Sequence, residues 1–264
     1  MIKNILTIAG SDSSGGAGIQ ADIKTISALG GYAMSVVTAI TAQNTCGVRA
    51  AHLVDEKLVR KQLEAIFDDI HVDAIKIGML GSSEIIYTVA ECLRNRNIPI
   101  VLDPVMVAKS GDLLLQSDAV TALKDALIPI TTLLTPNLPE AAVLLGQKEA
   151  DNRLNMECQA KELLSFGVKA VLLKGGHLQD DDSPDVLVTG NEFLWFEEKR
   201  FDTENTHGTG CTLSSALATL LGQGQSILDA TPSAKQYITK AIQSADQLMV
   251  GSGHGPTDHF WIHR

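Results

Sequence analysis

Two glycine-rich segments contain the residue types most suited to chemistry on a phosphate group. The second of them, Asn205-Thr-His-Gly208-Thr-Gly-Cys-Thr212, directly precedes an amphipathic stretch rich in small residues, 213–221. Glycines allow successive backbone N–H groups to point at one spot, and a helix N-terminus adds positive potential there. The junction is therefore a candidate anion hole for the charge that develops in phosphoryl transfer. A buried capping turn is the alternative reading. In either case Cys211 falls in the first helical turn, where the pKa of a thiol is usually lowered.

The first glycine-rich segment is Gly10-Ser-Asp-Ser-Ser-Gly-Gly-Ala-Gly18, after an apolar run. Its end, Gly16-Ala-Gly18-Ile-Gln-Ala21, formally matches the dinucleotide fingerprint, but no acidic residue occurs between Asp22 and Asp55 to hold a ribose. No Lys-Ser or Lys-Thr follows the glycines, so the segment is not a Walker A loop either. It is an amide-rich loop suited to close approach by a ligand, or simply a Ser/Gly turn.

Short apolar runs alternate with amphipathic stretches along the chain, a pattern that predicts βαβ units on a largely parallel sheet. Strands are expected at 5–9, 36–41, 74–78, 98–103, 132–135 and 170–174. Helices are expected after the cap Asp55, over 83–94, after Ser117, and twice at the end of the chain. A hairpin is expected from 185–189 and 194–201 around Gly190-Asn191. We expect a single α/β domain over residues 1–264.

The overall composition excludes several classes of function. The 264 residues are 45% hydrophobic, and the formal net charge is −10. That charge opposes broad binding to nucleic acid or anionic membranes, so any phosphate must be held by local cations. The four cysteines form no C-x-x-C pair, which favours a reducing cytosol. No signal peptide or membrane span is recognisable, so we expect a cytoplasmic protein.

Several segments together resemble a known group of enzymes. Gly208-Thr-Gly-Cys211 resembles the anion-hole signature of the ribokinase superfamily, usually G-A-G-D with aspartate as base. Further matching segments occur in that superfamily's order: Asp103-Pro-Val-Met106, Thr135-Pro-Asn-Leu-Pro-Glu140 and Lys174-Gly-Gly-His177. Together with residues 10–22, Thr41-Ala-Gln-Asn44 and residues 253–260, they resemble the hydroxymethylpyrimidine/phosphomethylpyrimidine kinase family specifically. The resemblance covers nearly the whole chain.

This resemblance implies a ribokinase-like three-layer αβα sandwich with a mostly parallel central sheet. It also implies an enzyme that uses ATP and Mg²⁺ to phosphorylate 4-amino-5-hydroxymethyl-2-methylpyrimidine, and then its monophosphate to the diphosphate, for thiamine synthesis. A homodimer is expected by analogy alone. A pyridoxal or pyridoxine kinase of the same fold remains open, since those acceptors are also heteroaromatic rings with a hydroxymethyl group.

The resemblance also assigns residues to the pyrimidine. The Gln43 amide can donate and accept hydrogen bonds, so it suits the ring nitrogen and amino group of an aminopyrimidine. Asp22 and the backbone of Gly10 would reach the same pocket. Met79 and Val105 would form its apolar walls, although apolar residues at strand ends also commonly just pack.

On the nucleotide side, Lys174 at a strand end would contact ATP phosphates. Asp103, Asn137 and Glu140 would organise Mg²⁺ and its waters, although a glutamate in a helix's first turn is favourable without any metal. The remaining nucleotide-side residues implied by the resemblance are Lys109 in a flap at Lys109-Ser-Gly111, and His207 and Lys235 beside the adenine. For the last two, a solvated surface position is an equal alternative.

The implied catalytic set is Cys211, Lys174 and the amides of Gly208, Thr209 and Gly210. The phosphoryl-transfer transition state is loose, so a strong base is not essential, and the sequence leaves open whether Cys211 is a base or only an amide donor. A neutral thiol would avoid the repulsion that an aspartate would exert on a phosphorylated acceptor.

Two functions from other classes are disfavoured by the sequence. A nicotinamide-dependent oxidoreductase lacks the acidic residue noted above. A sensor that has lost catalysis would be expected to lack phosphate-handling groups, yet Lys174, Asn137 and Glu140 are all present.

Overall fold

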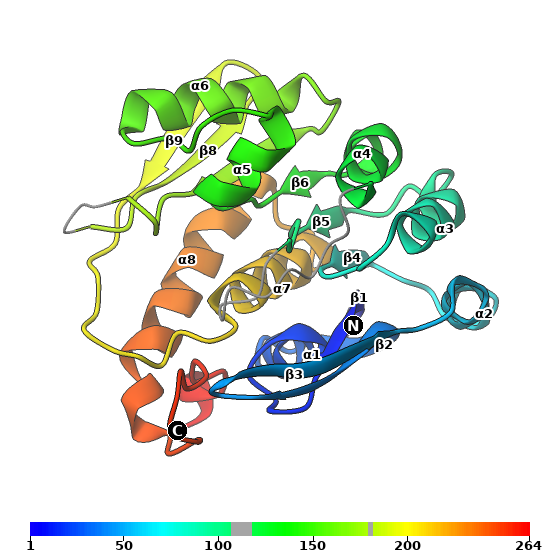
Figure 1. Cartoon of the computed structure of the whole chain (residues 1–264), viewed down its shortest axis with the longest axis horizontal. Helices are drawn as coiled ribbons and strands as arrows, with labels where there is room; N and C mark the ends of the chain where they lie inside the picture. The colour runs from blue at the N-terminus through cyan, green and yellow to red at the C-terminus, as the bar shows by residue number, and fades with distance from the viewer. Residues whose placement is uncertain (107–117, 179–181) are drawn as a thin grey trace.

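The computed structural model describes residues 1–106, 118–178 and 182–264. The strands are β1 Asn4–Asp12, β2 Tyr32–Asn44, β3 Gly47–Leu53, β4 Ala74–Ile77, β5 Ile100–Leu102, β6 Leu133–Leu134, β7 Ala170–Lys174, β8 Asp185–Thr189 and β9 Glu192–Phe196. They form one sheet in the order β3-β2-β1-β4-β5-β6-β7-β8-β9 (Figure 1). Strands β2, β1, β4, β5, β6 and β7 run parallel to one another, whereas β3, β8 and β9 are each antiparallel to their neighbours.

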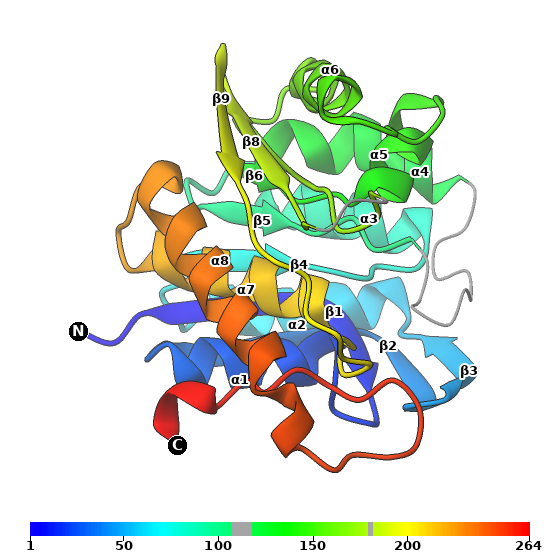
Figure 2. The ribbon, with the colours of Figure 1, turned by 90° about the vertical axis from the view of Figure 1, so that its left-hand side faces the viewer.

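Helices cover both faces of this sheet (Figures 1 and 2). One layer consists of α1 Gly18–Ala28, α7 Thr209–Gly222 and α8 Ile227–Gln243. The other consists of α2 Glu56–Phe67, α3 Ser83–Leu93, α4 Ala119–Ala122, α5 Leu138–Leu145 and α6 Arg153–Leu164. Shorter helical segments are Leu123–Leu127, Ile128–Ile130, Ala245–Gln247 and Trp261–His263.

The sheet has a hydrophobic core on each face. On β7, Ala170 and Leu172 pack with the core of α7 and α8, whereas Val171 and Leu173 pack with the core of the opposite layer. Successive side chains of a strand point to opposite faces, so a strand that is apolar at every position must be covered twice. The predicted three-layer α/β architecture is therefore confirmed.

Most predicted elements are confirmed within a few residues. The strand at 170–174 is found with the same bounds, and α2 begins after Asp55, whose side chain accepts a hydrogen bond from the N–H of Lys57. The hairpin is also confirmed, but its second strand ends at Phe196, five residues before the predicted 201. The edge strand β3 was not predicted.

The chain order of the strands creates a reversal next to β1. The chain runs from β1 outward to β2 and β3, and then crosses back to β4 on the other side of β1. In open α/β sheets, ligands bind outside the carboxyl ends of the strands at such a switch point. The fold therefore points to the ends of β1 and β4 as the place to search for a site.

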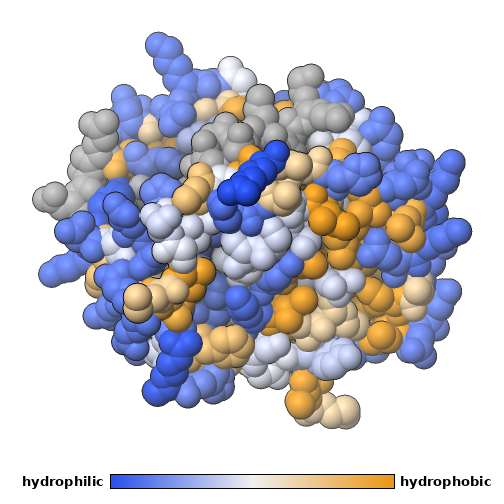
Figure 3. Space-filling view, turned by 60° about the horizontal axis from the view of Figure 1, so that its bottom comes forward, coloured by the Kyte–Doolittle hydropathy of each residue, from blue (hydrophilic) through white to orange (hydrophobic). Residues whose placement is uncertain are grey.

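Hydrophobic side chains also occur on the surface. Figure 3 shows one face of the molecule, on which hydrophobic residues gather in patches among hydrophilic ones. Among the exposed large hydrophobic residues are Ile40 on β2 and Leu58 on α2. Within the described ranges, every helix is too short or too polar to cross a bilayer.

Candidate active site

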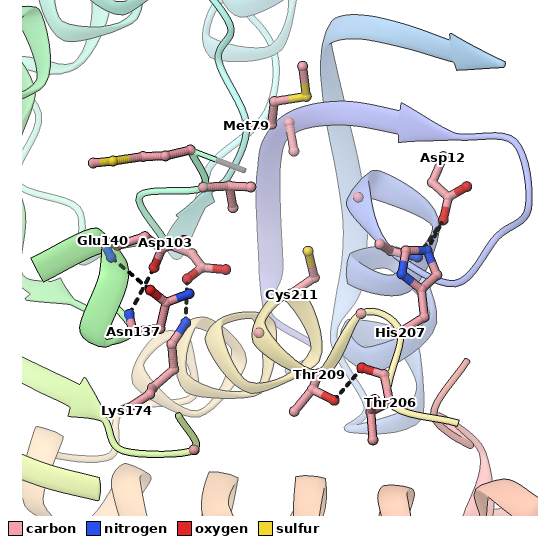
Figure 4. Close-up of a pocket in the computed structure, with 18 of the residues that line it drawn as sticks. Asp12, Met79, Asp103, Asn137, Glu140, Lys174, Thr206, His207, Thr209 and Cys211 are labelled. Atoms are coloured by element: carbon pink, nitrogen blue, oxygen red, sulfur yellow. Dashed lines mark hydrogen bonds and ion pairs between the residues drawn. The ribbon is translucent and has the colours of Figure 1, made fainter. Parts of the chain in front are cut away.

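A cavity of about 850 Å³ lies at the carboxyl ends of the parallel strands. Its wall includes residues that follow β1, β4, β5 and β7, together with the first turns of α5 and α7. Figure 4 shows three groups of side chains around it: a cluster about Lys174, the first turn of α7 with Cys211, and the pair Asp12 and His207. These groups come from segments far apart in the sequence, which the sheet brings to one edge.

The first turn of α7 lies in the middle of the cavity wall, between the other two groups of side chains. Gly208 caps the helix with φ +79, and a side chain there would overlap the carbonyl oxygen of Gly16. The two glycine-rich segments therefore pack directly against each other. A side chain at Gly210 would begin 3.3 Å from Oδ2 of Asp103 and 3.4 Å from Nζ of Lys174. Since N–H groups in a first turn lack partners within their helix, this turn can offer amides to an anion beside a lysine.

The Lys174 cluster combines a cation with two carboxylates. Nζ of Lys174 lies 2.8 Å from Oδ1 of Asp103. Burial lowers the pKa of Lys174, but Asp103 and Glu140 outweigh it, and the net shift is upward. Burial, assisted by Asp103, raises the pKa of Glu140 to about 7 even though Lys174 opposes the shift. The cluster therefore contains a firmly charged lysine and a glutamate whose charge is costly without a further cation.

Asn137 and Glu140 cap the start of α5. The N–H of Glu140 donates to Oδ1 of Asn137 at 2.8 Å, and the N–H of Asn137 donates to Oε2 of Glu140 at 2.8 Å. This reciprocal capping box is the metal-free role considered for the pair. Both residues nevertheless line the cavity.

The oxygen donors of this cluster are of the kind that Mg²⁺ prefers. In the described part of the chain, no group of three or more His, Cys, Asp or Glu side chains is placed to hold a metal ion. Mg²⁺ keeps several waters and usually takes only one or two protein carboxylates in addition to substrate phosphates. Asp103 and Glu140 fit that type of site, and a divalent cation would offset the cost of charge on Glu140.

Asp12 and His207 connect the two glycine-rich segments. Oδ2 of Asp12 lies 2.8 Å from Nε2 of His207, and Nε2 of Gln43 lies 3.3 Å from the same ring nitrogen. Asp12 also accepts hydrogen bonds from the N–H groups of Ser14, Gly16 and Ala17. Burial raises the pKa of Asp12, but these hydrogen bonds, that of His207 foremost, outweigh it and bring the pKa to about 2.

The backbone N–H groups of the first glycine-rich segment therefore bind a carboxylate of the same segment. Three of its N–H groups, which the sequence suggested for a ligand, hold the Asp12 carboxylate instead. These hydrogen bonds hold the loop in its conformation. Because Asp12 also binds His207, they help to hold the residue that directly precedes Gly208.

Cys211 lies in the first turn of α7, as expected, but the expected direction of its pKa shift is wrong. Burial raises the pKa of the thiol to about 11. Lys76 and the N–H of Gly18 lower it, but by less than burial raises it. Cys211 is therefore a neutral thiol near pH 7, because removal from water outweighs the favourable field of a helix terminus.

A family model described as phosphomethylpyrimidine kinase matches residues 12–258 of the chain. The chain belongs to this family. It is similar to the hydroxymethylpyrimidine/phosphomethylpyrimidine kinase of Salmonella typhimurium, with 50% identity over 97% of this chain and 97% of the relative.

Two solved structures extend the likeness to the fold. Phosphomethylpyrimidine kinase from Clostridium difficile 630 has a TM-score of 0.81 and 48% identity, over 91% of this chain and 99% of that one. An ADP complex of Bacillus subtilis pyridoxal kinase has a TM-score of 0.92 and 37% identity, over 100% of this chain and 99% of that one. The ribokinase-like architecture expected from the sequence is confirmed.

Most of the residues that the family resemblance assigned do line the cavity. Those assigned to the acceptor are Gly10, Gln43, Met79 and Val105, those assigned to the nucleotide are Asp103, Asn137, Glu140, Lys174 and His207, and those assigned to catalysis include Gly208, Thr209, Gly210 and Cys211. His207, however, lies beside Gln43 and apart from the Lys174 cluster. His207 is 8% exposed, so its alternative as a solvated surface residue is wrong. Lys109 lies outside the described residues.

The roles predicted for Asp22 and Lys235 are wrong. Asp22 is fully buried, and it does not line the cavity because its side chain points inward from α1 to Lys76, Thr7 and Ser215. Lys235 is also buried, with Nζ 2.6 Å from Oδ2 of Asp185, and it does not line the cavity either. It is therefore neither a residue of the cavity wall nor a solvated surface residue.

Several residues of the cavity wall were missed from the sequence, among them Asp12 and Lys76. Asp12 lies inside the glycine-rich segment, where the residue composition indicates only a loop. Lys76 interrupts the apolar strand Ala74-Ile-Lys-Ile77, and a charge in a strand covered on both faces was the signal that could have identified it.

Proposed function

We infer that this chain transfers the terminal phosphoryl group of ATP to the hydroxymethyl group of 4-amino-5-hydroxymethyl-2-methylpyrimidine, and then to the phosphate of the product, in thiamine biosynthesis. The observation that carries this inference is the arrangement of one cavity. In Figure 4 the α7 glycine turn lies between Lys174 on one side and the pair Asp12 and His207 on the other, and Gln43 lies 3.3 Å from His207. A phosphate donor and a ring acceptor can therefore meet across the turn.

Each side of the cavity has a distinct task. Lys174, with the amides of Gly210 and Cys211, would stabilise the charge on the transferring group. Gln43 would pair with the ring nitrogen and amino group of the acceptor, and Met79 and Val105 would contact its faces. His207 donates from Nε2 to Asp12, and the Gln43 amide lies beside this ring, 3.3 Å from the same nitrogen.

The two reactions differ in their proton balance. In the first, the hydroxymethyl oxygen attacks the γ-phosphorus, the bond from that phosphorus to the bridging oxygen breaks, and ADP leaves with one proton released to water. In the second, a phosphate oxygen attacks in the same way, and a dianionic acceptor releases no proton. Since the transition state is loose, the first proton can leave late, and a neutral thiol at Cys211 is compatible with both steps.

Asp103 and Glu140, with Asn137 beside them, would hold Mg²⁺ mainly through its waters. When bound, this ion would neutralise part of the negative charge on the ATP phosphates.

The decisive experiment is incubation of the purified protein with Mg-ATP and the pyrimidine alcohol, followed by mass analysis. We expect the monophosphate first and the diphosphate later. If neither product forms with any pyrimidine alcohol, the proposed function is wrong.

Pyridoxal or pyridoxine kinase is the second candidate. It is favoured by the likeness over the whole chain to a solved pyridoxal kinase. A competition assay with equal concentrations of the pyrimidine and of pyridoxal separates the two candidates, and we expect the pyrimidine to be phosphorylated preferentially.

We also propose that residues 1–264 act as one kinase domain, and that the protein forms a homodimer in the cytoplasm. The exposed β3 edge of the sheet and the exposed Ile40 beside it offer an apolar surface for a second copy. The four cysteines are free thiols, in keeping with a reducing compartment. Sedimentation equilibrium at micromolar concentration tests the dimer.

A further inference from the structure

A lysine lies fully buried beneath the cavity. Lys76 is in β4, and its Nζ lies 2.8 Å from each carboxylate oxygen of Asp22 in α1. Neither side chain has any exposed surface. Asp22 also accepts hydrogen bonds from the hydroxyls of Thr7, at 2.6 Å, and Ser215, at 2.7 Å. The network therefore joins β1, β4, α1 and α7.

The fold does not by itself require this ion pair. Removing two charges from water is costly, and apolar residues of similar volume often replace a buried pair with no loss of stability or with a gain. Ala74, two residues before Lys76 and on the same face of β4, packs in the apolar core of α7 and α8. An apolar side chain at position 76 would suit that face, so the pair calls for a functional reason.

The position of the Lys76 ammonium suggests such a functional reason. Lys76 is part of the cavity wall, and its Nζ lies against Gly78, where a side chain would begin 2.7 Å from it. Ser215, which anchors Asp22, follows Cys211 by four residues and therefore lies on the same face of α7.

Of the two charged residues, Lys76 lines the cavity and Asp22 does not. Burial raises the pKa of the Cys211 thiol; Lys76 opposes this shift, and it does so more strongly than Asp22 adds to it. The ion pair therefore presents its positive end to the acceptor side of the glycine turn.

The other lysines of the cavity wall are placed elsewhere. Lys174 is the last residue of β7 and is already paired with Asp103, and Lys199 comes after β9, at the same end of the strand order. Lys76, in contrast, is in β4, beside β1, whose end contributes Gly10 to the acceptor side. Of these three lysines, it alone belongs to the acceptor side.

We propose that Lys76 is a specificity-determining residue for the second acceptor, because its buried ammonium offsets the negative charge of a phosphomonoester placed beside Cys211. The proposal rests on the proposed function. In the second step a phosphate oxygen attacks the γ-phosphorus, the bond to the bridging oxygen breaks, and the products are the diphosphate and ADP. The first acceptor is an uncharged alcohol, so its ground state does not need this cation.

The test removes both charges together, so that no unpaired charge stays buried. In the double variant Lys76→Met/Asp22→Asn, the asparagine can still accept a hydrogen bond from Thr7 or Ser215. The kcat/KM values for the pyrimidine alcohol and for its monophosphate are measured separately with saturating ATP. We expect the monophosphate value to fall about tenfold or more, as for loss of a charge-assisted interaction, and the alcohol value to change by less than about threefold.

A matched control is Lys3→Met/Asp73→Asn, since this pair also has a 2.8 Å contact but does not line the cavity. We expect it to leave the ratio of the two values unchanged. If the apolar design does not fold, as judged by thermal unfolding, Lys76→Gln/Asp22→Asn keeps hydrogen bonding in the same space.

An unchanged ratio in a folded double variant would overturn the proposal, as would an equal loss of both steps, which is the result expected of a purely structural pair. Failure of the proposed function looks different, because the unmodified protein would then phosphorylate neither acceptor.

Discussion

The Lys174 ammonium lies 2.8 Å from Oδ1 of Asp103, with 15% of the lysine side chain and 3% of the aspartate side chain exposed. An arriving phosphate must therefore share a cation that already has a partner. Because burial alone would lower the pKa of Lys174 and its carboxylate neighbours more than reverse this, the pairing keeps the lysine charged before ATP arrives.

Replacing Lys174 with methionine removes the cation closest to Gly210. We expect kcat/KM for both phosphorylations to fall by roughly 10²- to 10³-fold, as when one electrostatic group of a transition state is lost. Steady-state kinetics with each acceptor measures this loss. Lys3→Met is the control, because Lys3 has a carboxylate partner at the same distance but stands outside the cavity. A Lys174→Met enzyme with nearly full activity would show that the phosphates bind elsewhere.

Gln43 is expected to recognise the acceptor ring. Gln43→Met keeps the length of the side chain but removes its amide, which leaves polar groups of a bound pyrimidine without partners. We expect kcat/KM for the alcohol to fall by roughly ten- to a hundredfold, mainly through KM, corresponding to about 1–3 kcal/mol. Gln147→Met, at an exposed position, provides the control. An unchanged KM for the pyrimidine would contradict the assignment.

The fold could be predicted largely because local signals agreed with its global arrangement. Strand β7 is apolar at four successive positions between helical patterns, and Asp55 and Ser82 are side-chain caps at the helix starts that the sequence indicated. Strand β3, Gly47-Val-Arg-Ala-Ala-His-Leu53, is mostly exposed and has no regular alternation of apolar and polar residues, so it gives only a weak strand signal. It forms because it pairs with β2, a tertiary contact that the sequence alone does not display.

The site was less predictable, because motifs give positions along the chain but not directions of side chains. Asp22 stands next to a glycine-rich loop, yet its carboxylate points into the core towards Lys76. The helix terminus at Cys211 suggested a lowered pKa, but the pKa depends on burial, which only packing decides.

Gly208 is expected to be essential for folding. Its φ of +79 is unfavourable for alanine, and an alanine Cβ would overlap the Gly16 carbonyl oxygen. Gly190 has a similar φ of +59, but nothing lies within 4 Å of a Cβ there. We expect Gly190→Ala to lower the free energy of unfolding by about 1 kcal/mol and Gly208→Ala by clearly more. Urea unfolding of both variants measures the difference, and equal losses would argue against close packing of the two loops.

Asp12 is expected to make stability depend on pH in acid. Its pKa in the folded chain, about 2, lies below the ordinary 3.8. A lowered carboxyl pKa contributes stability that is present above the ordinary pKa and is lost as the pH falls through the folded pKa. We therefore expect about 2 kcal/mol of stability to be lost between pH 4 and pH 2. Asp12→Asn should lack this component, as seen by comparing urea unfolding of the two proteins across that range. If the free energies of unfolding of the two proteins fell in parallel over this pH range, Asp12 would not be the source of the pH dependence.

Cys211→Asp is expected to separate the two phosphorylations. The alcohol acceptor is uncharged, whereas its monophosphate carries roughly two negative charges near neutral pH. An aspartate 4 Å from one of those charges would cost about 4 kcal/mol at an effective dielectric of 20, enough to suppress the second step by roughly a thousandfold. Cys211→Ser is also neutral and should support both steps.

Product analysis with ATP and each acceptor in turn measures the effect. For Cys211→Asp we expect accumulation of the monophosphate with little diphosphate, and for Cys211→Ser we expect both products. Because the pKa of the native thiol is raised to about 11 by burial, the native rates should show no inflection from Cys211 between pH 6 and pH 9. An aspartate variant that makes the diphosphate as readily as the monophosphate would show that the neutrality of Cys211 is not what admits the charged acceptor.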